Sequence, residues 1–209
     1  MESIYTKLFL YAVIVISASF HEFAHAFAAF SLGDSTAKDE GRLTLNPLKH
    51  VDLIGTVIVP LSLLFLSGTF IGWAKPVPYN PYNLRDKKYG SLKVGLAGPA
   101  ANFLIALILG IFFRLASNGI FGVNTFSEIF LVSLALIIYI NIFLGLFNLI
   151  PIPPLDGSKA LMDLFPKTAN AMAALGIFGI VLALGIAFFF LSPVAGFVFK
   201  LIVGQSFGF

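Results

Sequence analysis

Three ionisable residues lie within five positions of the first apolar stretch: His21, Glu22 and His25. On a helix, residues i and i+4 project from one face about 40° apart, so both imidazoles can reach a single metal ion. Glu22 lies beside that face, where it can accept a proton from water rather than coordinate. A charged group near the bilayer centre costs at least about 2.5–3.5 kcal/mol, so three ionisable residues within five positions need an explanation. A purely structural cluster is therefore the weaker alternative.

A catalytic zinc site takes three protein ligands and a water, so this pair needs a third residue. The remaining histidine, His50, lies in a polar segment and is interpreted as an interfacial residue. Asp156 is the better candidate, because it follows an apolar stretch that ends in Pro151, Pro153 and Pro154. Prolines unwind a helix, and unwound backbone at membrane depth is typical of ion sites. The alternative is a plain helix end, with Asp156 capping a helix over residues 157–165.

The composition shows what kind of elements carry these residues. Of 209 residues 58% are hydrophobic and 11% are charged, whereas soluble domains have about 45–50% and about 25%. A soluble domain of this size could not cover so much apolar surface. The net charge of +3 is too small to indicate nucleic-acid binding, and the lack of cysteine excludes disulfides and thiolate metal sites. We therefore predict an all-α polytopic membrane protein with a single domain over residues 1–209.

Four to six transmembrane helices are expected from the apolar stretches. The first stretch would be about 35 Å long as a helix, enough to cross a hydrocarbon core of about 30 Å. It is not interpreted as a cleaved signal peptide, because its basic flank is thin and the apolar pattern continues. The long stretches are residues 8–30, 53–73, 94–116, 126–150 and 169–191, followed by a shorter apolar tail from Pro193 that carries Lys200.

Basic residues predict the topology of these stretches. Residues 34–52 and 74–93 carry most lysines and arginines, whereas residues 117–125 carry no charge. The positive-inside rule then places the basic segments in the cytoplasm. Both ends of residues 53–73 are therefore cytoplasmic, which predicts a re-entrant or broken hairpin bent at Pro60; a plain span with one basic loop outside is the alternative. The first and fourth stretches both end on the cytoplasmic side, so the topology lets Asp156 meet the histidine pair there.

Several motifs resemble the site-two protease family of intramembrane zinc metalloproteases. Residues 72–78 are similar to a compact prokaryotic branch of that family, without a PDZ domain. The other motifs are His21-Glu22-Phe23-Ala24-His25, Asn148-x-x-Pro151-x-x-x-Leu155-Asp156-Gly157, and Gly98-Pro99-Ala100-Ala101-Asn102, which is similar to a motif of the family's middle core helix.

The resemblance implies a role for each site residue. His21, His25 and Asp156 would bind Zn²⁺, and Glu22 would act as general base. Asn148 and Asn102 would contact the substrate or the developing oxyanion. The substrate would be a single-span membrane protein, cut in the lipid bilayer of the cell membrane near the cytoplasmic boundary, often in the regulated release of signalling factors. The oligomeric state is not indicated, and no nucleic acid is expected as a partner.

A helical substrate must unwind before its carbonyls become accessible. We therefore predict that residues 40–46 form a small edge β-strand near the cytoplasmic face, which holds the substrate by β-augmentation. An interfacial loop is the alternative for these residues.

Two other functions compete with proteolysis. A divalent metal-ion transporter could use a His/Asp site at membrane depth, but such transporters usually show inverted repeats, which are not visible here. A transporter also has no need of the non-ligating Glu22. A membrane-embedded scaffold that keeps the metal site without turnover is the third interpretation. The sequence favours the protease, because every motif residue is present.

Overall fold

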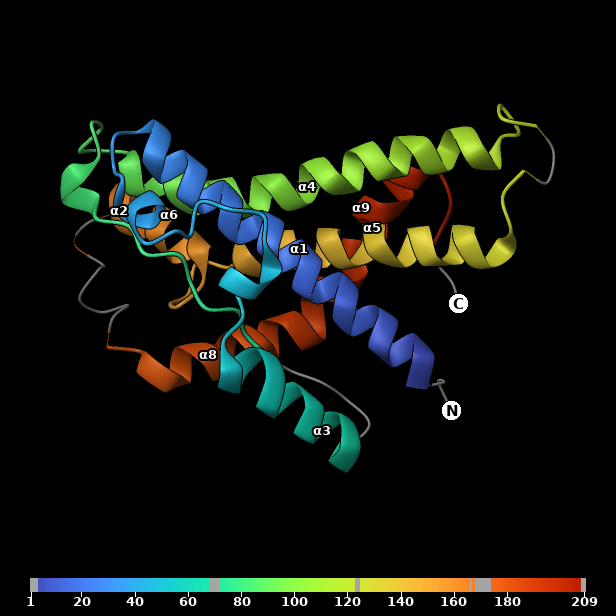
Figure 1. The fold of residues 1–209 in the computed structure, drawn as a ribbon, viewed down its shortest axis with the longest axis horizontal. Coiled ribbons are helices and arrows are strands. Elements are labelled where there is room, and N and C mark those ends of the chain that lie inside the picture. Colours follow the sequence, from blue (N-terminus) through green and yellow to red (C-terminus); the bar gives the residue numbers. More distant parts are fainter. Residues whose placement is uncertain (1–3, 68–71, 123–124, 166, 168–173, 208–209) are drawn as a thin grey trace. The chain divides into compact units, whose positions relative to one another are not determined.

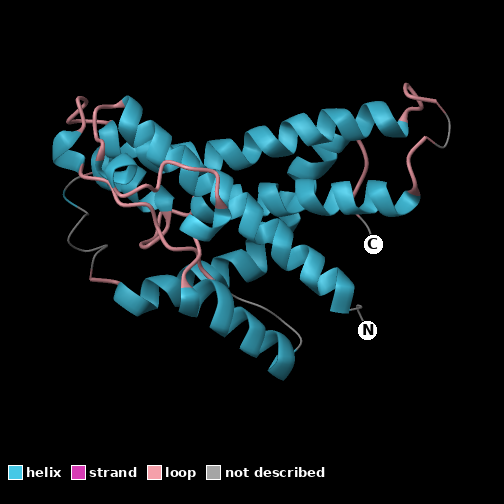
Figure 2. Cartoon of the chain, in the orientation of Figure 1, coloured by secondary structure: helices cyan, strands magenta, loops and turns pink. Residues whose placement is uncertain are grey.

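The computed structural model describes residues 4–67, 72–122, 125–165, 167 and 174–207. All regular structure in these residues is helical, as Figure 2 shows, which confirms the all-α prediction. Four helical stretches among them are long and apolar enough to cross a membrane: Ile4–Ser31, Gly90–Ser117, Glu128–Asn148 and Phe178–Val203. The predicted polytopic membrane protein is therefore confirmed.

The chain divides into two compact units, Met1–Gly98 and Pro99–Phe209, and helix α4 (Gly90–Ser117) contributes to both. The prediction of a single domain over the whole chain stays a prediction. A small cluster of Ala29, Leu84 and Val94 packs inside the first unit. Besides the start of α4, that unit contains α1 (Ile4–Ser31), α2 (Thr36–Asp39), the 3₁₀ turns η1 (Pro47–Lys49) and η3 (Pro81–Asn83), the π-helical η2 (Leu53–Ile58) and α3 (Val59–Ser67).

The predicted hairpin segment starts and ends at the same place in the first unit. Helix η2 continues directly into α3 (Figure 1), and residues 68–71 lie outside the described residues. The backbone N–H of Trp73 donates to the carbonyl of Gly55 at 3.0 Å, and the Thr56 hydroxyl donates to the carbonyl of Trp73 at 2.8 Å. The two ends of the segment therefore lie side by side, as a re-entrant hairpin requires.

The predicted bend at Pro60 is wrong, because the helix continues through this residue. A proline inside a helix cannot donate to the carbonyl four residues earlier, which here belongs to Thr56. The backbone before Pro60 is π-helical, and the Tyr11 hydroxyl of α1 donates to the carbonyl of Thr56. The carbonyl that Pro60 leaves without its usual donor thus has a partner on another helix, and no break is needed.

The second unit contains the remainder of α4 and the last two spans. Helices α4 and α5 (Glu128–Asn148) lie side by side in Figure 1 and share a buried cluster with α9 (Ser192–Val203). A second cluster packs residues after α5 against the last span. The first cluster includes Phe113, Ile138, Ile142 and Phe199; the second includes Ile150, Ile152, Ala183 and Leu191.

The last span differs from the prediction of a span over residues 169–191 and a separate tail from Pro193. Helix α8 (Gly176–Ile186), the π-helical η5 (Ala187–Leu191) and α9 follow one another without a break, while residues 168–173 lie outside the described residues. Pro193 lies in the first turn of α9, next to the π-helical turn, where its missing N–H is tolerated.

The end of this span lies beside the end of α4. The Arg114 guanidinium donates to the carbonyl of Leu201 at 2.9 Å. Residue 203 and residues 117–122 of the uncharged loop therefore lie at the same end of the second unit. The charge pattern predicts that this loop lies outside the cytoplasm, and the end of α9 would then lie outside as well. The sequence alone left this side open.

Asp34 joins the end of α1 to the loop before α4 and is fully buried. Its carboxylate accepts hydrogen bonds from the Thr36 hydroxyl at 2.6 Å, from the backbone N–H of Asn80 at 2.7 Å and from the Asn83 amide at 2.9 Å. Burial raises the pKa of Asp34, but these hydrogen bonds prevail and lower the pKa below its ordinary value of 3.8. The ionised carboxylate is therefore the form that the fold stabilises.

We expect Asp34→Asn to destabilise the protein by about 1–3 kcal/mol, because an amide cannot accept from all three donors. Since the folded-state pKa is depressed, the carboxylate contributes fully above pH 4 or so and less as the pH falls below 3.8. Thermal unfolding in detergent between pH 3 and pH 7 measures both effects. The difference in unfolding temperature between the wild type and the variant should become smaller towards pH 3. Asp39→Asn, at an exposed position of α2, is the control; equal losses in both variants would contradict the prediction.

Candidate metal centre

Helix α1 places His21 and His25 one turn apart on a buried face. Their rings meet edge to face with centroids 4.6 Å apart. The Nδ1 atom of His25 lies 2.6 Å from the carbonyl oxygen of Val94 on α4. A carbonyl only accepts, so Nδ1 carries the proton and Nε2 keeps its lone pair. This is the arrangement that orients a histidine for metal binding.

Gly98 on α4 shows that the two ligand atoms converge. A Cβ at this glycine would lie 2.4 Å from Nε2 of His25 and 2.5 Å from Nε2 of His21. Both nitrogens therefore face one small space, which any side chain at residue 98 would fill. Two imidazole nitrogens directed at one point are suited to Zn²⁺, which binds histidine nitrogen in a tetrahedral site. The residues of the first unit thus fit the ion.

Glu22 lies between the two histidines in sequence and is half-buried. Its Oε2 atom accepts a hydrogen bond from the backbone N–H of Val77 at 2.8 Å. Val77 belongs to the loop between α3 and α4, 55 residues further along the chain. A loop of the first unit therefore holds the carboxylate that the sequence singled out as a proton acceptor.

Asp156 is the first residue of α6 (Asp156–Leu164) in the second unit. The N-cap of α6 is Leu155, and no side chain caps the helix. The alternative that Asp156 is an N-cap is therefore wrong. A Cβ at Gly157 would lie 2.3 Å from the carbonyl oxygen of Leu149, so the glycine lets α6 begin directly against the end of α5. The Asp156 carboxylate accepts from the Lys159 ammonium at 2.8 Å. Its meeting with the histidine pair stays a prediction.

The two predicted asparagines lie in the second unit. Asn102 is fully buried on α4, and its amide donates to the amide oxygen of Asn141 on α5 at 3.0 Å. Asn141 in turn donates to the carbonyl of Ile137 at 2.9 Å. Asn148, at the end of α5, donates to the carbonyl of Leu144 at 3.0 Å. Sequence reasoning missed Asn141, whose only signal is an amide in the middle of an apolar span. The substrate roles of Asn102 and Asn148 stay predictions.

The polar segment after α2 differs from one expectation. Residues 40–46 form turns and bends, and no strand occurs in any described part of the chain, so the edge-strand prediction is wrong and the loop alternative holds. Local contacts occupy the backbone: the N–H of Arg42 donates to Ala37 at 2.7 Å, and the carbonyl of Thr44 lies 2.8 Å from Nε2 of His50. His50 is only 2% exposed, so its side chain is buried within this loop, and its position at the membrane interface stays a prediction.

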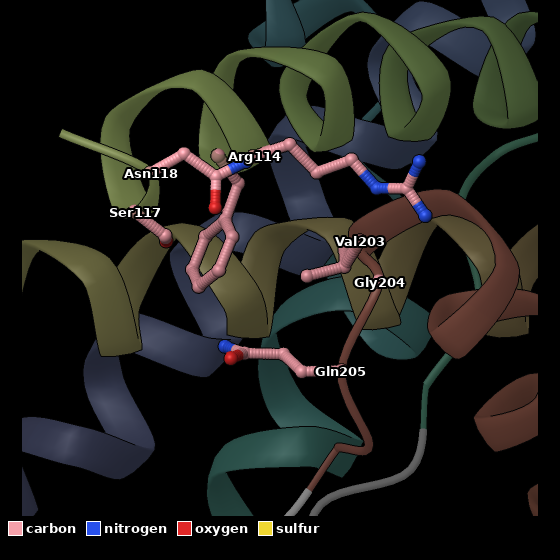
Figure 3. Close-up of a pocket in the computed structure, with 7 residues that line it drawn as sticks. Arg114, Ser117, Asn118, Val203, Gly204 and Gln205 are labelled. Carbon is pink, nitrogen blue, oxygen red and sulfur yellow. The ribbon is translucent and has the colours of Figure 1, made fainter. Parts of the chain in front are cut away.

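A cavity of about 280 Å³ lies elsewhere, at the ends of α4 and α9 (Figure 3). The Arg114, Asn118 and Gln205 side chains line it, and none of the predicted site residues does. We therefore do not assign the metal chemistry to this cavity. Its full lining is Phe113, Arg114, Ser117, Asn118, Val203, Gly204 and Gln205.

Apolar spans that carry a histidine pair fitted for zinc, with a glutamate beside it, define the class of membrane-bound metalloproteases. The chain belongs to peptidase family M50, whose family model matches residues 9–192. This confirms the resemblance to the site-two proteases, which are intramembrane zinc metalloproteases. The protein is therefore a metalloendopeptidase and a multi-pass membrane protein.

Curated relatives agree with this assignment. The chain is 38% identical over 166 residues to "Putative zinc metalloprotease YwhC" of Bacillus subtilis. The aligned residues make up 78% of this chain and 72% of the relative. The chain is 34% identical over 160 residues to "Putative zinc metalloprotease Rip2" of Mycolicibacterium smegmatis, which covers 76% of this chain and 58% of the relative. Less than two thirds of that longer protein is thus matched. No solved structure matches the chain.

Proposed function

We propose that the protein hydrolyses a peptide bond in or near the transmembrane segment of a single-span membrane protein, with Glu22 as general base. The observation that carries the proposal is the convergence of the two histidine Nε2 atoms beside Gly98, on a transmembrane helix that also bears Glu22. The zinc metalloprotease names of the relatives support the same chemistry.

Three residues would hold the zinc ion in this proposal: His21, His25 and Asp156. Two imidazole nitrogens and one carboxylate oxygen are a common ligand set of hydrolytic zinc sites. The charge pattern places the ends of α1 and α5 on the same side of the membrane, which supports the participation of Asp156. When bound, zinc polarises the scissile carbonyl and lowers the pKa of water to about 7.

Glu22 would move the protons of the reaction. Its carboxylate takes a proton from the attacking water and later gives one to the leaving amine. Asn148 is half-buried at the end of α5, and its amide is a candidate donor to the developing oxyanion. The Asn102 amide donates to Asn141, so Asn102 would also help to align α4 with α5.

The substrate would reach the site from the bilayer, and the site would face the cytoplasm. Glu22 lies nine residues before the end of α1 at Ser31, which is about 13 Å along the helix axis. The loops that follow α1 carry the basic residues that mark the cytoplasmic side. Water needs to travel only this short distance from the cytoplasm to reach the carboxylate.

The test compares wild type with Glu22→Gln in zinc-loaded vesicles that contain a model single-span substrate. We expect the variant to keep its zinc and to lose cleavage by about 10²–10⁴-fold, the usual contribution of a general base. Glu40→Gln, at an exposed position after α2, is the matched control. Zinc uptake is measured in the same vesicles. Uptake without cleavage in the wild type would favour a transporter, and neither activity would favour a scaffold.

A further inference from the structure

One extended segment contacts Glu22, and we call residues 73–78 the strap. The strap follows the hairpin segment and appears among the loops in Figure 2. Several hydrogen bonds within the first unit hold its backbone. The carbonyl of Trp73 accepts from Thr56, the N–H of Lys75 donates to the carbonyl of His50 at 2.9 Å, and the N–H of Val77 donates to Glu22. The last of these contacts reaches the proposed catalytic carboxylate.

The sequence of the strap makes this last contact stiff. Pro76 and Pro78 have no backbone N–H, so Val77 supplies the one main-chain donor of the three residues. A residue before proline is confined to extended backbone, and this applies to both Lys75 and Val77. The direction of the Val77 N–H is therefore set by the backbone, with little freedom to turn away from Glu22.

Arg42 fixes the strap directly before Val77. Arg42 is only 5% exposed, and its guanidinium donates to the carbonyl of Lys75 at 2.6 Å and to the carbonyl of Pro76 at 3.4 Å. Its Nε atom is buried and has no hydrogen-bond partner among the described residues. Burying a cation is costly unless it is well paired, and the two strap carbonyls offset part of that cost for Arg42.

We propose that Arg42 and the strap position the general base. Arg42 is a positioning residue: it holds two carbonyls of the strap, and the strap directs the Val77 N–H to one oxygen of the Glu22 carboxylate. A carboxylate with one oxygen fixed has a defined orientation, so its other oxygen is presented to the proton that it must take. The proposal rests on the proposed role of Glu22, and it adds the main-chain donor and the buried arginine that set its geometry.

The first test observes the contact without any activity. The dipeptide Pro-Val occurs at residues 76–77 and 193–194 only, so ¹³C-carbonyl proline with ¹⁵N-valine gives two NMR signals from the full chain in detergent. Val194 lies in α9 and serves as the internal control. We expect Glu22→Ala to shift the Val77 signal and to speed its amide exchange about tenfold, with Val194 unchanged. Arg42→Lys should act in the same direction, since lysine lacks the planar fork. If the chemical shift and the amide exchange rate of Val77 were the same in both variants as in the wild type, the proposal would be overturned.

The second test measures cleavage and zinc content together. We expect Arg42→Lys and Val77→Pro to lower kcat up to about 100-fold, with KM and zinc content close to wild type. Val77→Ala keeps the main-chain N–H and should therefore retain most of the wild-type kcat. Lys49→Gln, an exposed basic residue of the same loop region, is the unchanged control. Loss of zinc together with kcat would show a merely structural role and overturn the proposal. A wild type that cleaves nothing would refute the proposed function, whereas the NMR test would still judge the contact.

Discussion

Replacing Gly98 by alanine should abolish zinc binding and peptide-bond cleavage together. The added Cβ would lie within 2.5 Å of Nε2 of both His21 and His25. The His25 ring cannot simply turn aside, because its Nδ1 is hydrogen-bonded to the carbonyl of Val94, which lies one turn before Gly98 on α4. The methyl group would therefore occupy the space toward which the two nitrogens point. The two histidines could then no longer coordinate the same metal ion.

Zinc content after dialysis, measured by atomic absorption, checks this prediction. Gly196→Ala is the matched control, because a Cβ there meets nothing within 4 Å and the position is also helical. Alanine in that helix should be neutral or slightly stabilising, by up to about 1 kcal/mol, with full zinc content. A Gly98→Ala protein that binds zinc like the wild type would mean that the histidine pair is not the metal centre.

Asp156→Asn should weaken zinc binding by more than about 100-fold, beyond the 10–100-fold that changes outside the ligand shell usually cost. Asparagine keeps the size of the side chain but removes the charge of the third proposed ligand. Competition with a fluorescent zinc chelator measures the affinity. We expect cleavage to fall in parallel, because the remaining pair of histidines is an incomplete catalytic site.

Two controls separate ligation from other effects of this change. Asp163→Asn makes the same substitution on the same helix, away from its start. Lys159→Met removes the ion pair with Asp156 and keeps the carboxylate. Both variants should retain zinc. Unchanged zinc affinity in Asp156→Asn would mean that the third ligand is another residue.

The sequence was most informative where helical periodicity and the free-energy cost of ionisable residues in a membrane span indicate the same residues. The histidine pair could be predicted because four-residue spacing on a helix fixes which side chains share a face. The helical class and the spans followed from hydrophobic length. The proline positions were interpreted incorrectly at Pro60 and Pro193, since a π-helical turn before each proline removes the conflict that would break an α-helix. Nothing in the sequence indicates such a turn.

The contacts made by the loops could not be predicted from the sequence, for a different reason. The alternation around Arg42 is typical of a strand, but the arginine turns inward to carbonyls 33 and 34 residues away. The contact between Glu22 and Val77 joins residues 55 positions apart. Contacts of this kind depend on how the loops fold over α1, and side-chain patterning does not encode them.

The donor that holds Glu22 has a particular consequence for variation in this protein. It belongs to the main chain, so the identity of the side chain at position 77 is nearly irrelevant to it. Any amino acid except proline can supply the same group. A substitution at position 77 that keeps the main-chain N–H should therefore leave Glu22 held in the same orientation.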